Sequence, residues 1–296
     1  MKNFAILSLI TILLACGGAP QTEAPVAEEV AIAPPVQGTV AASDGVPIAY
    51  TIRGAGSPAL VFIHGWMCNQ SFWDGQAQPM SESNTVVTLD LAGHGLSGMD
   101  REGWPLMAFG SDVQAVVEHL GLEDVILIGH SMGGPVALEA ARLMPDRVIG
   151  VIGVDSLQDA DASYDPAQAE AILTQFNTDF AATCNQFVAS MFLEGADPTL
   201  KERVRTDMCD GSPEVGTALM TQFMDYELGA ALAAVSVPVR CVNAGLWPTN
   251  VEGNRVYNED FDAVIIDGPG HFLMMEMPEQ FNAHLALAVA ELSEPF

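Results

Sequence analysis

Short aliphatic runs that alternate with longer amphipathic stretches constrain the fold of this chain more than any other feature. Runs that are apolar at consecutive positions are typical of strands covered by helices on both faces, and therefore of a parallel sheet. We expect such strands at 58–65, 84–93, 123–130, 148–156, 237–245 and 261–268. Helical patterns occupy 110–122, 133–144 and 278–293, and two alternating stretches around Asp44-Gly45 predict an antiparallel hairpin before the sheet.

The strand–helix alternation breaks between about 157 and 234, where helical patterns follow one another without a strand. The 296 residues therefore predict an α/β core at 38–156 and 235–296 with an inserted helical cap at 157–234. The cap carries many large apolar side chains, which we interpret as packing because helices generally bury their apolar faces. One apolar side could also roof a pocket. These residues are Phe176, Phe180, Phe187, Met191, Phe192, Leu219, Met220, Phe223 and Met224.

The amino end "MKNFAILSLITILLAC" has a basic start, an apolar run and a small residue before Cys16, which predicts a signal peptide at 1–15. Its last residues resemble the lipobox of bacterial lipoproteins, which implies lipidation of Cys16 and anchoring in the cell envelope, with Gly17 favouring the outer membrane. The alternative is an ordinary signal peptide with a chance cysteine. Residues 17–37, rich in Ala, Pro and Glu, are interpreted as a disordered tether.

The formal net charge of −28, from 38 acidic and 10 basic residues, argues against nucleic acid as a partner, because such binding needs a basic surface. It favours neutral or cationic substrates more weakly. The membrane is expected to be a partner only through the lipid anchor.

Four cysteines besides Cys16 would lie in an oxidising compartment. Cys184 and Cys209 fall in one polar helical stretch, and we predict a disulfide between them, although spacing alone does not fix the pairing. Cys241 is interpreted as a buried thiol in a strand, and the state of Cys68 is left open.

The segment "GHSMGG" at 129–134 lies between a predicted strand and a predicted helix, which is the context that a G-x-S-x-G nucleophile elbow requires. In this turn Ser131 would point out of the sheet as a nucleophile, and Gly129 and Gly133 would avoid collisions. The free N–H groups at the start of the helix, that of Met132 among them, favour an oxyanion. His130 is interpreted as a packing residue.

A second oxyanion donor and a base are also predicted from the sequence. In "VFIHGWMCNQSFW" the loop after the strand can bring the N–H of Trp66 beside that of Met132, with His64 supporting the loop. His271 in "IIDGPGHFLMMEMPEQF" follows a strand directly, at the sheet edge where Ser131 is expected, and is the predicted base.

The remaining histidines are assigned no chemistry. His94 and Asp90 in the glycine turn "DLAGHGLS" are interpreted as architectural, and His119 and His284 as surface residues on helices.

Together "HGW", "DLAGHGLSG", "GHSMGG" and "GPGHFLMMEMPEQF" resemble the α/β-hydrolase superfamily over residues 40–296. The resemblance implies a serine hydrolase for a small or medium carboxylic ester, lactone or thioester, without a metal or an organic cofactor. "HGW" is similar to esterases and cofactor-free haloperoxidases. A perhydrolase or a C–C bond hydrolase is the alternative within the enzymes, and a non-catalytic ligand-binding lipoprotein is the alternative outside them.

In the superfamily, the acid that orients the histidine usually follows the strand that corresponds to 237–245. Here that place holds Leu-Trp-Pro-Thr-Asn at 246–250, without a carboxylate. In some members the acid ends the preceding strand, which implies Asp155 as the acid. An aspartate there could also cap the loop without catalytic duty. Glu252 is the second candidate and Asp267 the third.

Overall fold

The computed structural model describes residues 1, 34–163 and 165–294. The predicted signal peptide beyond Met1, Cys16 and the predicted tether up to residue 33 lie outside these residues. From residue 34 on, the described residues belong to one compact unit. Among them, no helix combines the length and the apolar character needed to cross a membrane.

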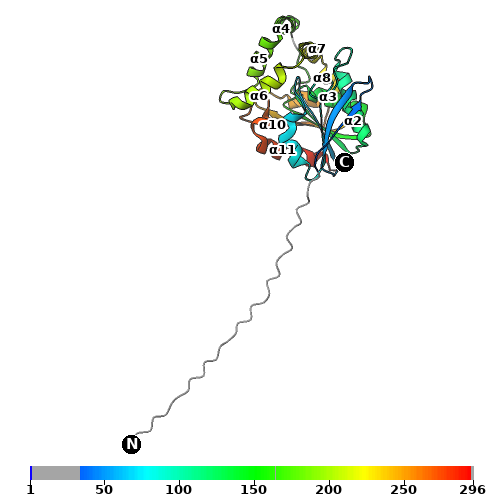
Figure 1. Ribbon diagram of the computed structural model, residues 1–296, viewed down its shortest axis with the longest axis vertical. Helices are drawn as coiled ribbons and strands as arrows, with labels where there is room; N and C mark the ends of the chain where they lie inside the picture. Colours follow the sequence, from blue (N-terminus) through cyan, green and yellow to red (C-terminus); the bar gives the residue numbers. More distant parts are fainter. Residues whose placement is uncertain (2–33, 164, 295–296) are drawn as a thin grey trace. The chain divides into compact units, whose positions relative to one another are not determined.

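An eight-stranded sheet forms the centre of this unit, in the order β1-β2-β4-β3-β5-β6-β7-β8 (Figure 1). β2 pairs antiparallel with β1 and with β4, and all other neighbours are parallel. This confirms the predicted mostly parallel α/β sheet. The strands are β1 Val36–Ala41, β2 Pro47–Arg53, β3 Ala59–Ile63, β4 Thr85–Leu89, β5 Val125–His130, β6 Val148–Val154, β7 Val239–Ala244 and β8 Phe261–Ile266.

The continuous aliphatic runs become the central strands, and every residue of β3 and β5 is buried. The hairpin turns where expected, with the Asp44 side chain accepting a hydrogen bond from the N–H of Val46 at 3.1 Å. β1 begins at Val36, two residues before the predicted start of the core. The sequence pattern missed this start because Val36 is 61% exposed and the strand is held by backbone pairing with β2, not by burial.

Helices cover both faces of the sheet. α2 packs against α3, and α1 packs against α10 and α11; Figure 1 shows α2 and α3 on one side and α10 and α11 on the other. α2 ends at a left-handed Gly121 with a φ of 62°, which only glycine adopts without strain. The helical elements of the core are η1 Gln70–Trp73, α1 Asp74–Met80, α2 Leu106–Leu120, α3 Gly133–Leu143, α9 Val251–Arg255, α10 Leu273–Glu276 and α11 Pro278–Leu292.

Among the described residues, five helices lie between β6 and β7, within the range predicted for the cap. They are α4 Pro166–Thr178, α5 Phe180–Ser190, α6 Pro198–Cys209, α7 Pro213–Met224 and α8 Leu228–Ala233. Asp165, Asp197 and Ser212 cap three of them with side-chain oxygens, and each is followed by a proline at the first turn. This combination starts a helix efficiently, because the cap accepts a free N–H and proline lacks one.

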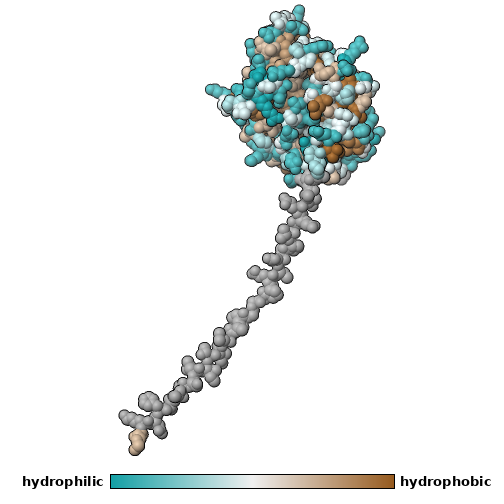
Figure 2. All heavy atoms as spheres, in the orientation of Figure 1, coloured by the Kyte–Doolittle hydropathy of each residue, from teal (hydrophilic) through white to brown (hydrophobic). Residues whose placement is uncertain are grey.

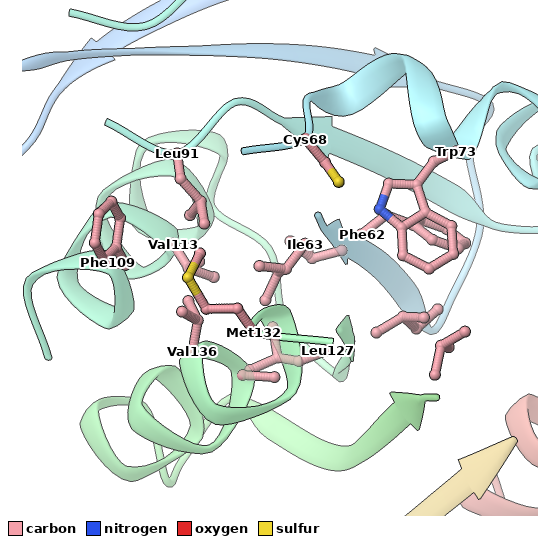
Figure 3. Packing of buried hydrophobic residues seen from close by; sticks show 14 of the residues in the cluster. Phe62, Ile63, Cys68, Trp73, Leu91, Phe109, Val113, Leu127, Met132 and Val136 are labelled. Atoms are coloured by element: carbon pink, nitrogen blue, oxygen red, sulfur yellow. The ribbon is translucent and has the colours of Figure 1, made fainter. Parts of the chain in front are cut away.

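The hydrophobic core reaches the carboxyl edge of the sheet. Figure 3 shows Ile63 of β3, Leu127 of β5 and Val136 of α3 around Met132, which is 1% exposed. The residue directly after Ser131 is therefore fixed in the core. On the outside, hydrophilic side chains cover much of the face drawn in Figure 2, in keeping with the large number of acidic residues.

Candidate active site

Ser131 occupies a tight turn between β5 and α3. Its φ of 53° lies in the left-handed region that serine rarely adopts. Its N–H donates to the carbonyl of Val154 at 3.0 Å, and its own carbonyl accepts from the Ser156 hydroxyl at 2.6 Å. A Cβ on Gly129 would lie 2.1 Å from the Gly133 carbonyl oxygen, so the turn requires glycine there.

The predicted oxyanion donors lie next to this turn. A Cβ on Gly65 would be 3.1 Å from the Ser131 Cβ, which places the loop after β3 directly beside the serine. Within the described ranges, the amides of Trp66 and Met132 donate no backbone hydrogen bond. Both residues line the same cavity as Ser131. Two unused N–H groups beside a serine form a site suited to a negatively charged oxygen.

His271 and Asp155 are in direct contact. The His271 Nδ1 lies 2.5 Å from Asp155 Oδ2, and the two residues are 4% and 1% exposed. The other carboxylate oxygen of Asp155 accepts from the N–H of Ala244 at 3.0 Å. Because Nδ1 contacts Asp155, only Nε2 of His271 is free to exchange a proton with a group in the cavity. Ser131 lines the same cavity.

The loop that lacks a carboxylate has a supporting arrangement of its own. Asn243, at the end of β7, accepts from the N–H of Ser156 at 3.1 Å and donates to the carbonyl of Ser156 at 3.1 Å and to the Thr249 hydroxyl at 3.0 Å. The end of β7 thus holds the segment that contains Asp155 instead of providing an acid. Sequence reasoning missed Asn243, because its contacts depend on the pairing of β6 with β7.

The structure does not bring the second and third candidate acids to His271. The Glu252 side chain is 85% exposed, and its carboxylate lies 2.8 Å from Arg255 Nη1 on the same helix. Asp267 is also exposed.

Glu276, His130 and Trp247 also hold His271 or the backbone beside it. None of the three was predicted to do so. Glu276 accepts from the N–H groups of Gly270 and Phe272 at 3.1 and 3.2 Å, and burial raises the pKa of its carboxyl group. His130 donates from Nε2 to the His271 carbonyl at 3.0 Å, so it does more than pack. Burial holds the pKa of His130 well below its usual range, which keeps the ring neutral.

Trp247, in the loop 246–250 that lacks a carboxylate, is the third side chain that contacts His271. Its ring stands edge-on to the His271 imidazole, with centroids 5.1 Å apart at 72°.

The residues interpreted as architectural lie behind the loops of the site. His64 accepts from the N–H of Leu91 at 3.0 Å and donates to the Gly65 carbonyl at 2.8 Å, and burial lowers its pKa to about 4. His94 lies beside it, and burial lowers its pKa to about 3. Asp90 accepts from the N–H of Gln70 at 2.7 Å.

The two histidines predicted on helix surfaces are both on helices. His119 is exposed and His284 is half-buried, so the second lies less open to solvent than expected.

A cavity of about 320 Å³ lies over Ser131 and His271 and beneath the cap. Several of the apolar cap residues interpreted as packing line it, together with Met208: they are Phe176, Phe187, Met191, Met220, Phe223 and Met224. The Trp66 indole donates to the Gly216 carbonyl of α7 at 2.8 Å, which ties the loop after β3 to the cap.

The cysteines are distributed between the cap and the core. Cys184 and Cys209 form a disulfide between α5 and α6, with Cα atoms 5.6 Å apart. Cys68 and Cys241 are free and buried, and burial raises the pKa of both thiols. In the described part of the chain, no cluster of three His, Cys, Asp or Glu side chains is arranged to hold a metal ion.

A family model described as "Alpha/beta hydrolase family" matches residues 60–284. A non-heme haloperoxidase of Rhodococcus erythropolis is 40% identical over 111 residues, which are 37% of this chain and 40% of that protein. A 3-oxoadipate enol-lactonase of Acinetobacter baylyi is 26% identical over 250 residues, 82% of this chain and 93% of that protein.

The matches to the first curated relatives cover only 31% to 40% of the length of those relatives. Among solved structures, an esterase from Exiguobacterium antarcticum shares the fold, with a TM-score of 0.75 and 21% identity over 85% of this chain and 98% of that one.

Proposed function

This chain belongs to the alpha/beta hydrolase family, and we propose that it is a serine hydrolase that cleaves a carboxylic ester through an acyl-enzyme on Ser131. The contact between His271 Nδ1 and Asp155 Oδ2, at the edge of a cavity that Ser131 also lines, carries the proposal. A histidine oriented by a buried carboxylate is the arrangement that activates a serine.

In the first half of the reaction, the Ser131 hydroxyl oxygen attacks the ester carbonyl carbon and its proton passes to His271 Nε2. The N–H groups of Trp66 and Met132 stabilise the oxyanion that forms, by several kcal/mol relative to water. His271 then gives its proton to the departing alcohol, and Asp155 stabilises the transient imidazolium.

In the second half, water attacks the acyl group on Ser131 while His271 accepts a proton from it. Collapse of the second tetrahedral intermediate releases the carboxylic acid and returns the proton to the Ser131 oxygen. No residue outside the chain is required for either half.

Among the relatives, the names esterase and enol-lactonase both denote cleavage of a carboxylic ester bond. The haloperoxidase relative supports a second candidate, a perhydrolase, in which hydrogen peroxide replaces water as the acyl acceptor and a peracid is released. Pure ligand binding has less support, because the described contacts orient His271 and leave two amides free beside Ser131. Carbon–carbon bond hydrolysis would use the same groups, and analysis of the products distinguishes it from ester hydrolysis.

The test is hydrolysis of p-nitrophenyl acetate and butyrate by the chain from residue 34 on and by two variants. Ser131→Ala should reduce kcat by several orders of magnitude, and Asp155→Asn by on the order of 10⁴-fold, because the histidine then loses its orienting carboxylate. Glu252→Gln is the matched control and should change kcat less than twofold, since Glu252 faces solvent. Circular dichroism and thermal melting check that each variant folds.

A large loss in Ser131→Ala without one in Asp155→Asn would place the acid elsewhere. Full activity of the Ser131→Ala protein would contradict the proposal. Peroxide added to the parent distinguishes the two candidates, since a perhydrolase then yields peracid in place of most of the acid.

We also propose that the protein is held at the bacterial cell envelope by acyl chains on Cys16. The apolar run before this cysteine supports the proposal.

A further inference from the structure

Among the described residues, no formally charged side chain lines the cavity between the cap and the sheet. Besides His130 and His271, its polar lining consists of backbone around Gly65, the Ser131 hydroxyl and three uncharged cap residues, Gln175, Thr183 and Gln186, together with the Cys68 thiol. No lysine or arginine within 34–163 and 165–294 reaches it.

An ionised group of a ligand would therefore find no opposite charge in this cavity. Burying a carboxylate without a partner costs several kcal/mol, because its hydration is lost and nothing replaces it. The strongly negative chain, at −28, adds unfavourable long-range repulsion for an anion.

The apolar part of the lining indicates what the cavity does accept. Met191, Met208 and Met220 contribute flexible thioether side chains, which adapt to apolar groups of different shape. Phe176 and Phe187 add flat apolar surface to the same lining. A volume of about 320 Å³ is at the lower end for ligand pockets, which limits the ligand to a small or medium size.

We infer that the substrate is an ester that is uncharged on both sides of the scissile bond, with an apolar chain of medium length in the cap cavity, and that carboxylate-bearing esters are rejected. This inference rests on the proposed function, because it assigns the substrate class of the same site.

Two matched ester pairs test the inference with the chain from residue 34 on. On the acyl side, p-nitrophenyl hexanoate is compared with the mono-p-nitrophenyl ester of adipic acid. On the alcohol side, hexyl acetate is compared with 6-acetoxyhexanoate. In each pair kcat/KM should be on the order of 100-fold higher for the uncharged member, the size expected when a buried carboxylate stays unpaired.

A charge introduced at the cavity should reverse part of this preference. Gln175 is exposed on α4 and lines the cavity, so a longer side chain there can be accommodated. Gln175→Arg should raise the ratio of kcat/KM for the adipate half-ester to kcat/KM for hexanoate about tenfold. Gln175→Met is the uncharged control and should leave this ratio as in the parent.

The outcomes separate this inference from the proposed function. If hydrolysis depends on Ser131 but both members of each pair react within threefold, the serine hydrolase stands and the inference is overturned. If no ester is cleaved in a Ser131-dependent way, the proposed function fails. The inference is then tested by comparing how tightly the protein binds the uncharged and the charged ester. Calorimetric titration of Ser131→Ala should then give a lower Kd for the hexanoate ester than for the half-ester, and equal or absent binding would refute it.

Discussion

At the scale of single residues, the site holds two side chains on backbone that is unfavourable for them. Ser131 and Asp155 have φ values of 53° and 40°, in the left-handed region that costs non-glycine residues about 1 kcal/mol or more. Both are fixed by buried hydrogen bonds, from the Ser131 N–H to Val154 and from the Ala244 N–H to Asp155. The surrounding sheet thus stabilises a conformation that neither residue would adopt alone.

Buried neutral histidines predict that the protein loses stability in acid. Burial lowers the pKa of His64 to about 4, whereas an unfolded histidine has a pKa of about 6.5. Between these values the unfolded state binds a proton that the folded state does not, so the free energy of unfolding falls as the pH falls from 6.5 towards 4. His64 alone should contribute roughly 1 to 2 kcal/mol between pH 6.5 and 5.

Urea unfolding at pH 7, 6.5, 6 and 5 measures this effect. His64→Gln, which keeps a hydrogen-bond acceptor, should flatten the pH dependence, although it lowers stability at pH 7. His119→Gln is the control, because His119 is exposed, and should leave the slope as in the parent. An unchanged slope in the His64 variant would show that another group carries the acid sensitivity.

The residues of the site differ in how far sequence could identify them. Ser131 lies in a local pattern of five residues, and His271 lies in a Gly-Pro-Gly loop soon after a strand, so each is visible without knowledge of the fold. Asn243 and Glu276 carry no such pattern, because their roles are hydrogen bonds to particular backbone groups. Those contacts exist only once β6 lies against β7 and the loop before α10 has closed.

At the scale of elements, sequence patterns locate the strands but overestimate their length. The run 84–93 continues with the apolar residues Leu91 and Ala92, yet β4 ends at Leu89. The following Asp90 turns the chain by accepting hydrogen bonds from the N–H groups of Gln70 and Leu96. The apolar residues after β4 are buried in the loop at the edge of the sheet, which hydrophobicity cannot distinguish from a strand.

The disulfide between two helices of the cap leads to a prediction about stability. Cys184 and Cys209 close a loop of 25 residues between α5 and α6, which both line the cavity. Removal of a disulfide over a loop of this length costs about 3 to 4 kcal/mol through the freedom that the unfolded chain regains. The double variant Cys184→Ala, Cys209→Ala should therefore melt roughly 10 °C lower, with a KM several-fold higher than the parent.

Dithiothreitol supplies the matching control for the disulfide variant. It should lower the melting temperature of the parent by a similar amount and leave that of the double variant unchanged. A parent that melts at the same temperature with and without reductant would rule out a stabilising role for the bond.

At the scale of the whole molecule, the amino-terminal segment predicts where the protein resides. In a bacterial host that processes lipoproteins, the full chain should partition into the membrane fraction. Cys16→Ser should move most of it into the soluble fraction, because acyl chains contribute about 0.8 kcal/mol per buried methylene and nothing replaces them. Mass spectrometry of the mature amino terminus detects the acyl groups, and an unmodified cysteine there would contradict the anchor.

The position of Asp155 also matters for protein engineering. This residue directly follows β6, and the chain leaves for the cap immediately after it, through Ser156 and a left-handed Leu157. Exchanging caps between relatives is an obvious route to new specificities, and the end of the strand is the natural place to cut. Under the proposed mechanism, a junction placed directly after β6 would remove Asp155 together with the cap. The acid that orients His271 would then have to come from the cap of the other protein. A chimera joined beyond Leu157 keeps the acid with its histidine and still exchanges all the helices from α4 to α8.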